Sequence, residues 1–185
     1  MAFDFRAYGS KVGEILALDQ NGERLMPLVA GRCSSEAARS VLKTQKAPDL
    51  FSKTRAPEAA LGGLLLYFSC ADDCHEIVQN VETPEGSFWH GIVHRQEPDP
   101  GNAAYWFRQT GSHAVFPELG RAADELASKY SNAPFRPGTK WDPFAFIDFC
   151  EMARREPGSE AERLAMEIQR AEWQILFDYC ARPMT

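Results

Sequence analysis

Two histidines one helical turn apart are the residues whose types and spacing best suit chemistry. His90 and His94 are separated by three residues, and Glu97 follows three positions later. On an α-helix these side chains fall within about 60° of one another. Imidazole and carboxylate groups bind divalent transition metals, and imidazoles also transfer protons near neutral pH. We therefore predict a site on this helix face, with His90, His94 and Glu97 as candidate metal ligands or catalytic groups.

A structural role is the alternative for the same pair. Histidines at the edge of a core often hydrogen-bond to carboxylates or carbonyls, and Glu97 would then lie in solvent. The H-E-x-x-H arrangement of metalloproteases is absent, because position 91 is Gly. The sequence thus allows a divalent metal as cofactor without requiring one.

The residues that follow His94 offer further groups for binding a ligand. We predict Arg95 as a clamp for an anion and Trp106 as a wall of the site. Asp99 caps the next helix, whose free N–H groups could hold an anion if that carboxylate did not already occupy them. Core packing is the alternative use of the aromatic residues 105–107. The predicted ligand-binding residues are Arg95, Asn102, Tyr105, Trp106 and Arg108.

A second group that could bind zinc is Cys70, Cys74 and His75. The three-residue gap between these cysteines differs from the two-residue gap usual in structural zinc sites. The acidic residues 72–73 also oppose the formation of thiolates. We therefore predict two small buried cysteines and a surface histidine. The cysteine count is odd, at 5, and the N-terminus has no apolar signal segment, which favours reduced thiols in a cytoplasmic protein.

Composition limits the partners that the chain can have. The net charge is −6, with no stripe of Lys or Arg, so we expect no nucleic acid partner. The longest apolar stretch, residues 59–68, contains Gly62 and Gly63 and falls short of the roughly 20 residues that span a membrane. We expect no membrane partner, and the choice between a small molecule and a protein partner stays open.

Helix-start signals indicate the fold class. Thr83, Asp99 and Asp142 are each followed by proline, and Ser159 begins a capping box. We predict an all-α fold, a single compact globule of about six or seven helices rather than a repeat solenoid. The later helices are expected at 84–97, 100–110, 117–131, 143–156 and 160–181.

The earlier part of the chain is less regular. A helix is expected from Ser34 or Ser35 to about residue 46, and a long buried helix over 57–81, in which Gly62 and Gly63 allow a close neighbour or a kink. For residues 10–30 we favour a helix, although Asn21-Gly22 could instead close a hairpin. Residues 1–33 form an uncertain segment of the one domain, and 57–181 form its helical core.

The hairpin over residues 90–108 has the pattern H-x3-H-R-x-E-x-D-x2-N-A-x-Y-W-F-R. This pattern, together with Trp141-Asp142-Pro143 and the helix with Glu172-Trp173-Gln174, resembles an uncharacterised family of small all-helical proteins. The resemblance implies a shared hairpin and no activity. The hairpin is also weakly similar to tetratricopeptide repeats, but it occurs once, and a stable stack needs about three.

These observations predict a cytoplasmic ligand-binding domain, metal-binding or enzymatic, with its site beside the His90/His94 face. We expect the two imidazoles to open towards a hollow that small molecules can enter. In the last helix, we place Glu172 on the surface and Trp173 in the core. The alternative is a helical protein–protein interaction module in which the hairpin is purely structural. Reaction, substrate and oligomeric state are not indicated by the sequence.

Overall fold

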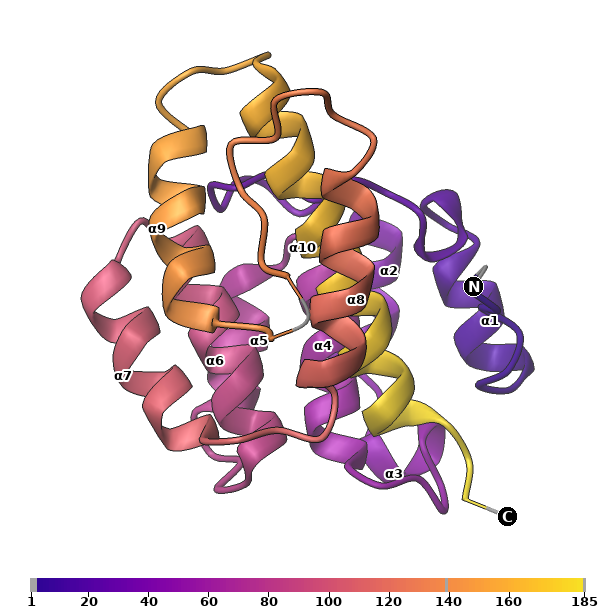
Figure 1. Ribbon diagram of the computed structural model, residues 1–185. Helices are drawn as coiled ribbons and strands as arrows, with labels where there is room; N and C mark the ends of the chain where they lie inside the picture. The colour runs from indigo at the N-terminus through magenta and orange to yellow at the C-terminus, as the bar shows by residue number, and fades with distance from the viewer. Residues whose placement is uncertain (1–2, 139, 185) are drawn as a thin grey trace.

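The elements of the structure are helices throughout. The computed structural model describes residues 3–138 and 140–184, and within these it contains ten α-helices, one 3-10 turn and no β-strand (Figure 1). The prediction of an all-α fold is therefore confirmed. The predicted number of six or seven helices was too low. The short helix over residues 47–50 was not expected, and the predicted helix over 57–81 is divided in two.

The N-terminal region is helical where a hairpin was the alternative. It contains α1 (Ser10–Leu16), η1 (Gln20–Gly22), α2 (Glu36–Lys43) and α3 (Ala47–Leu50). The Oγ of Ser35 caps α2 by accepting from the N–H of Ala38 at 3.2 Å. Asn21 adopts a left-handed conformation, with φ 55°, and turns the chain after α1 without pairing strands.

The predicted helix over 57–81 is two helices, α4 (Pro57–Tyr67) and α5 (Ala71–Val78). Ser69 is left-handed, with φ 57°, and its N–H donates to the carbonyl of Leu66. The N–H of Cys70 donates to the carbonyl of Leu65. These two bonds make a Schellman motif, which ends α4 and lets α5 leave in a new direction.

Close neighbours explain the paired glycines of α4. A Cβ on Gly62 would lie 2.5 Å from Val78 of α5, and a Cβ on Gly63 would lie 2.6 Å from the ring of Trp89. The carbonyl of Gly63 also accepts from Nε1 of Trp173 at 2.7 Å. Gly62 and Gly63 therefore serve the close approach of neighbouring helices.

The predicted capping residues begin the later helices, although several of these helices end earlier than expected. Side-chain oxygens of Thr83, Asp99, Asp142 and Ser159 accept from backbone N–H groups in the first turns. The helices are α6 (Pro84–Gln96), α7 (Pro100–Thr110), α8 (Phe116–Ala127), α9 (Pro143–Ala153) and α10 (Glu160–Ala181).

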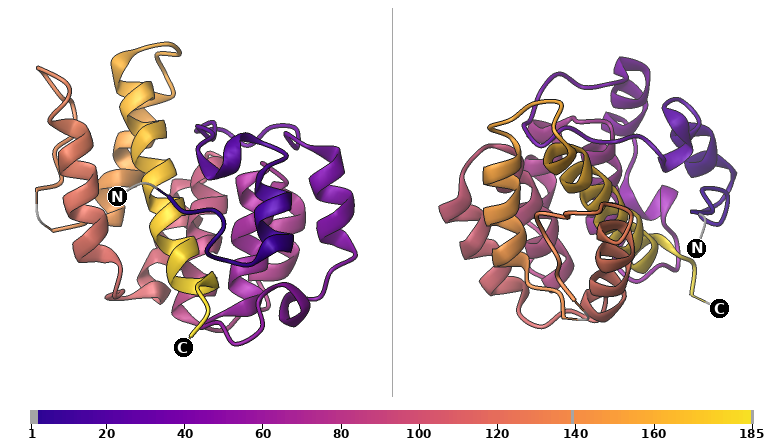
Figure 2. Two further views of the ribbon diagram at one scale, coloured as in Figure 1. Left: turned by 90° about the vertical axis from the view of Figure 1, so that its right-hand side faces the viewer. Right: turned by 45° about the horizontal axis from the view of Figure 1, so that its top comes forward.

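The last helix runs through the middle of the molecule. In Figure 2, α10 lies between α8 and α9 on one side and the N-terminal helices on the other, and it packs against α4, α8 and α9. Its buried face includes Leu164, Ile168, Trp173 and Phe177. None of the described helices combines the length and the apolar character needed to cross a membrane.

A disulfide corrects the prediction that all cysteines are reduced. Cys33 is bonded to Cys70, while Cys74, Cys150 and Cys180 are free and buried. The spacing of cysteines along the chain did not reveal this pair, because 37 positions separate the two residues and the turn after α4 brings them together.

Candidate metal centre

Three of the four histidines meet where α5 packs against α6. His75 comes from α5, and His90 and His94 come from α6. Each offers a ring nitrogen, and these nitrogens lie within 4.8 Å of one another. We call these three residues the histidine triad.

The geometry of the triad follows from its two helices. His90 and His94 stand one turn apart on α6, so their rings stack, with centroids 4.8 Å apart and planes 15° apart. The ring of His75 meets both edge-on, at 4.6 Å from His90 and 5.1 Å from His94. The Schellman turn before α5 is what directs this third imidazole at α6.

The central ring of the triad is buried without a polar partner. His90 is 3% exposed, and neither Nδ1 nor Nε2 has a hydrogen-bond partner in the described part of the chain. Trp106 of α7 covers the ring, stacked at 3.8 Å and 18°. A buried polar group without a partner costs about 1–3 kcal/mol, so a ligand that satisfies one of these nitrogens would be stabilising.

The same surroundings keep this imidazole neutral. Burial, followed by the neighbouring His75 and His94, lowers the pKa of His90 to about 3. The neutral ring has a free lone pair, which is the form that binds metal ions.

Glu97 lies outside the triad, beside His94. Its Oε2 is 2.9 Å from Nδ1 of His94, at an angle that does not make a hydrogen bond. The Glu97 side chain retains 32% of its exposure. A carboxylate that accepts from the second ring nitrogen of a metal-binding histidine orients the ring and raises its basicity, and Glu97 lies within reach of this role. Glu97 was predicted as the third ligand, but His75 holds that place in the triad.

The spacing of the triad nitrogens is close to that of a bound transition metal. Zn–N bonds of about 2.0–2.1 Å in a tetrahedral site place the nitrogens about 3.4 Å apart. The triad nitrogens lie within 4.8 Å of one another. To reach the tetrahedral spacing, the histidine side chains would have to move by about 1 Å or more. The three rings lie on two packed helices, so closure of the site requires side-chain movements of that size.

Arg95, the predicted anion clamp, points away from the triad into the core. It is 0% exposed, and its guanidinium forms a two-bond ion pair with the carboxylate of Glu172 on α10. Gln169 accepts from the same guanidinium at 3.4 Å, and the ring of Phe146 lies 4.5 Å from it. The prediction of Glu172 as a surface residue was wrong, because pairing with Arg95 lets a carboxylate be fully buried.

The remaining ligand-binding candidates on α7 separate into two groups. Trp106 stacks on His90, so it does form a wall, although the group it covers is an imidazole. Asn102, Tyr105 and Arg108 are exposed, and the side-chain amide of Asn102 donates to Asp99 at 2.7 Å.

Cys70, Cys74 and His75, for which a structural role was predicted, do not form a zinc site in the described part of the chain. Cys70 is part of the disulfide, and the sulfur of Cys74 faces α4, 3.8 Å from a Cβ placed on Gly62. The prediction of two small buried cysteines is confirmed. His75 was predicted to lie on the surface, but it is half-buried and its ring meets those of His90 and His94. A glycine near position 69 would have indicated that the helix ends there. The sequence has no glycine at that point, so the new direction of α5 was not predicted.

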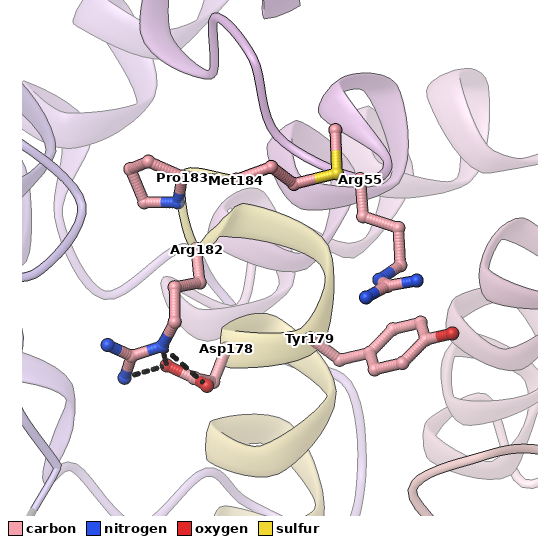
Figure 3. Close-up of a pocket in the computed structure, with 6 residues that line it drawn as sticks. All are labelled: Arg55, Asp178, Tyr179, Arg182, Pro183 and Met184. Carbon is pink, nitrogen blue, oxygen red and sulfur yellow. Dashed lines mark hydrogen bonds and ion pairs between the residues drawn. The ribbon is translucent and has the colours of Figure 1, made fainter.

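The predicted hollow beside the imidazoles does not match the pockets described. One pocket of about 400 Å³ lies at the end of α10 and is lined by Arg55, Asp178, Tyr179, Arg182, Pro183 and Met184 (Figure 3). There Arg182 pairs with Asp178 at 3.0 Å, and the guanidinium of Arg55 lies 4.3 Å from the ring centre of Tyr179. A second pocket lies between Lys129 and Glu167. Neither pocket is lined by the triad.

Comparisons with known proteins add no functional assignment. Searches against protein-family models, curated proteins and solved structures found no match. The resemblance of the hairpin to an uncharacterised helical family therefore stays a prediction. Function is therefore inferred from the geometry of the triad.

Proposed function

We propose that this protein binds a divalent transition metal through His75, His90 and His94. The observation that carries the proposal is the state of His90, whose two ring nitrogens are buried without partners between two other imidazoles. The histidines of a well-packed core normally find hydrogen-bond partners. A metal ion held by the triad would supply the missing partner for one of these nitrogens.

The donor set indicates the class of ion. Three imidazoles suit Zn²⁺, Cu²⁺, Ni²⁺ or Co²⁺, whereas Mg²⁺ and Ca²⁺ prefer oxygen ligands. Glu97 would act as the outer carboxylate that orients His94. An ion held by three histidines would have a fourth position to fill, and water fills it in zinc enzymes with three histidine ligands.

We also propose that the protein is cytoplasmic, and this proposal is independent of metal binding. Lasting disulfides are rare in that compartment, where bonded cysteines are usually catalytic or redox-sensing. The Cys33–Cys70 disulfide therefore requires a redox role if the protein is cytoplasmic.

Metal binding is tested on tag-free protein, stripped with a chelator and titrated with Zn²⁺ and Co²⁺. We expect one equivalent, a tetrahedral Co²⁺ absorption spectrum, and stabilisation of about 2.7 kcal/mol at a free metal concentration of 100 times Kd. The His75→Gln variant should lose at least tenfold in affinity. Because His75 is only half-buried, the substitution should leave the fold intact.

The fourth histidine provides the matched control. His113 lies outside the triad, between Phe88 and Tyr179, so His113→Gln should bind metal like the wild type. Less than about a tenth of an equivalent of bound metal in the wild type, or equal affinity in His75→Gln, would overturn the proposal. The competing function, an interaction module with a purely structural hairpin, predicts that result.

A further inference from the structure

The helix that carries His75 is anchored to α2 at two points. Cys70, the residue before α5, is bonded to Cys33, which lies three positions before the start of α2. One turn later, Asp73 accepts from Nε of Arg39 at 2.5 Å and lies 3.0 Å from Nζ of Lys43. Arg39 and Lys43 both belong to α2, so one covalent link and one set of ion pairs hold α5 against it.

This anchor affects one ligand of the triad far more than the other two. His75 is five residues after Cys70 and two after Asp73. His90 and His94 both lie on α6, which packs against α4 and α7 as well as against α5. The position of α5 therefore decides whether the site has three imidazoles or two.

We infer that the Cys33–Cys70 disulfide is a redox switch that sets the metal affinity of the triad. The inference rests on the proposed function. In the oxidised protein the disulfide holds the start of α5, and His75 faces His90 and His94. In the reduced protein α5 loses this covalent link. It is then held by its packing on α4 and α6, by the N–H of Ser34 on the carbonyl of Phe68, and by the partly exposed ion pairs of Asp73.

The chemistry of the switch requires a dithiol reductant. One thiolate of the dithiol attacks the sulfur of Cys33, which is the less buried of the two cysteines. The Cys33–Cys70 bond breaks, Cys70 leaves as a thiolate and takes up a proton, and a mixed disulfide forms on Cys33. The second thiol of the reductant resolves it, so the dithiol becomes a disulfide while the protein gains two thiols, two electrons and two protons.

The size of the effect follows from the population that can bind. If His75 occupies its ligating position in about a tenth of the reduced molecules, the apparent affinity falls about tenfold. The switch would thus load the site under oxidising conditions and release the ion when dithiols are abundant.

The test compares Co²⁺ affinity in the two redox states. Tag-free protein with the disulfide verified by mass is titrated before and after treatment with dithiothreitol, which is then removed without oxygen. We expect about tenfold weaker binding after reduction. Cys33→Ser is the matched control, because it should bind weakly in both conditions and should not respond to the reductant. Circular dichroism reports whether the reduced chain keeps its helices.

The outcomes separate the switch from the proposed function. Equal affinity in the two states, or tighter binding with a thiolate-to-cobalt absorption band after reduction, would overturn the switch alone. Failure of the oxidised wild type to bind would overturn both. If reduction unfolds the chain, the double variant Arg39→Gln with Lys43→Gln in the oxidised protein removes the other half of the anchor, and an unchanged affinity there would overturn the coupling.

Discussion

Arg95 and Glu172 form a buried ion pair that fixes how α6 packs against α10. The pair has side-chain exposures of 1% and 0%, and it joins α6 to α10 across 77 positions of sequence. Gln169 completes the arrangement by donating to the carbonyls of Met26 and Pro27, at 3.1 and 3.2 Å. Removing one partner leaves the other charge buried and unpaired. The loss of one partner should therefore destabilise the fold more than the loss of both.

We expect Glu172→Gln to lower the free energy of unfolding by about 3–5 kcal/mol, because it leaves the Arg95 cation buried without its partner. The double variant Arg95→Met with Glu172→Leu should cost much less. Urea denaturation measures both. Arg163→Gln, which removes an exposed ion pair with Glu167, is the control and should change little. A single variant as stable as the double variant would contradict this account.

Neighbouring side chains approach α4 closely at its two glycines, so a substitution there tests how tightly the helix is packed. Gly63→Ala would place a methyl group 2.6 Å from the ring of Trp89. We expect a loss of about 1–3 kcal/mol from overpacking, despite the better helix propensity of alanine. Thermal unfolding, with Gly31→Ala as control, provides the measurement, since a Cβ on Gly31 meets no atom within 4 Å. An unchanged or raised Tm for Gly63→Ala would show that α4 can move aside.

The starts of helices could be predicted from sequence, and the break between α4 and α5 could not. Thr83, Asp99, Asp142 and Ser159 act through local hydrogen bonds, which their residue types determine. Ser69 takes a left-handed conformation that glycine usually provides, so nothing in its type indicated a helix end. Two of the three triad residues were predicted because both lie on α6. The third depended on the direction of α5, which follows from the turn at Ser69 that the sequence did not indicate.

Buried histidines make the stability of the whole molecule depend on pH. Burial lowers the pKa of His113 below its ordinary value, although Glu85 lies 3.8 Å from its Nε2 and acts in the opposite direction. The unfolded chain therefore binds a proton that the folded chain does not. The contribution of His113 is complete above its unfolded pKa of about 6.5 and is lost as the pH falls below that value.

We expect the free energy of unfolding to fall between pH 7 and pH 5, by at most about 2 kcal/mol for each such histidine. His113→Gln should make this dependence shallower, since glutamine keeps an acceptor for the N–H of Val115 and does not titrate. Denaturation curves at several pH values measure it. Identical slopes for variant and wild type would show that His113 does not contribute.

The central place of α10 also has a consequence for the order in which the protein is synthesised. Helix α4 is apolar nearly all round and is covered in part by α10, which the ribosome makes much later. At a synthesis rate of about 5–20 residues per second, several seconds pass between the synthesis of α4 and that of α10. The nascent chain therefore exposes apolar surface of α4 until α10 has been made, and completion of the core comes late in synthesis, with chaperones expected to protect that surface meanwhile.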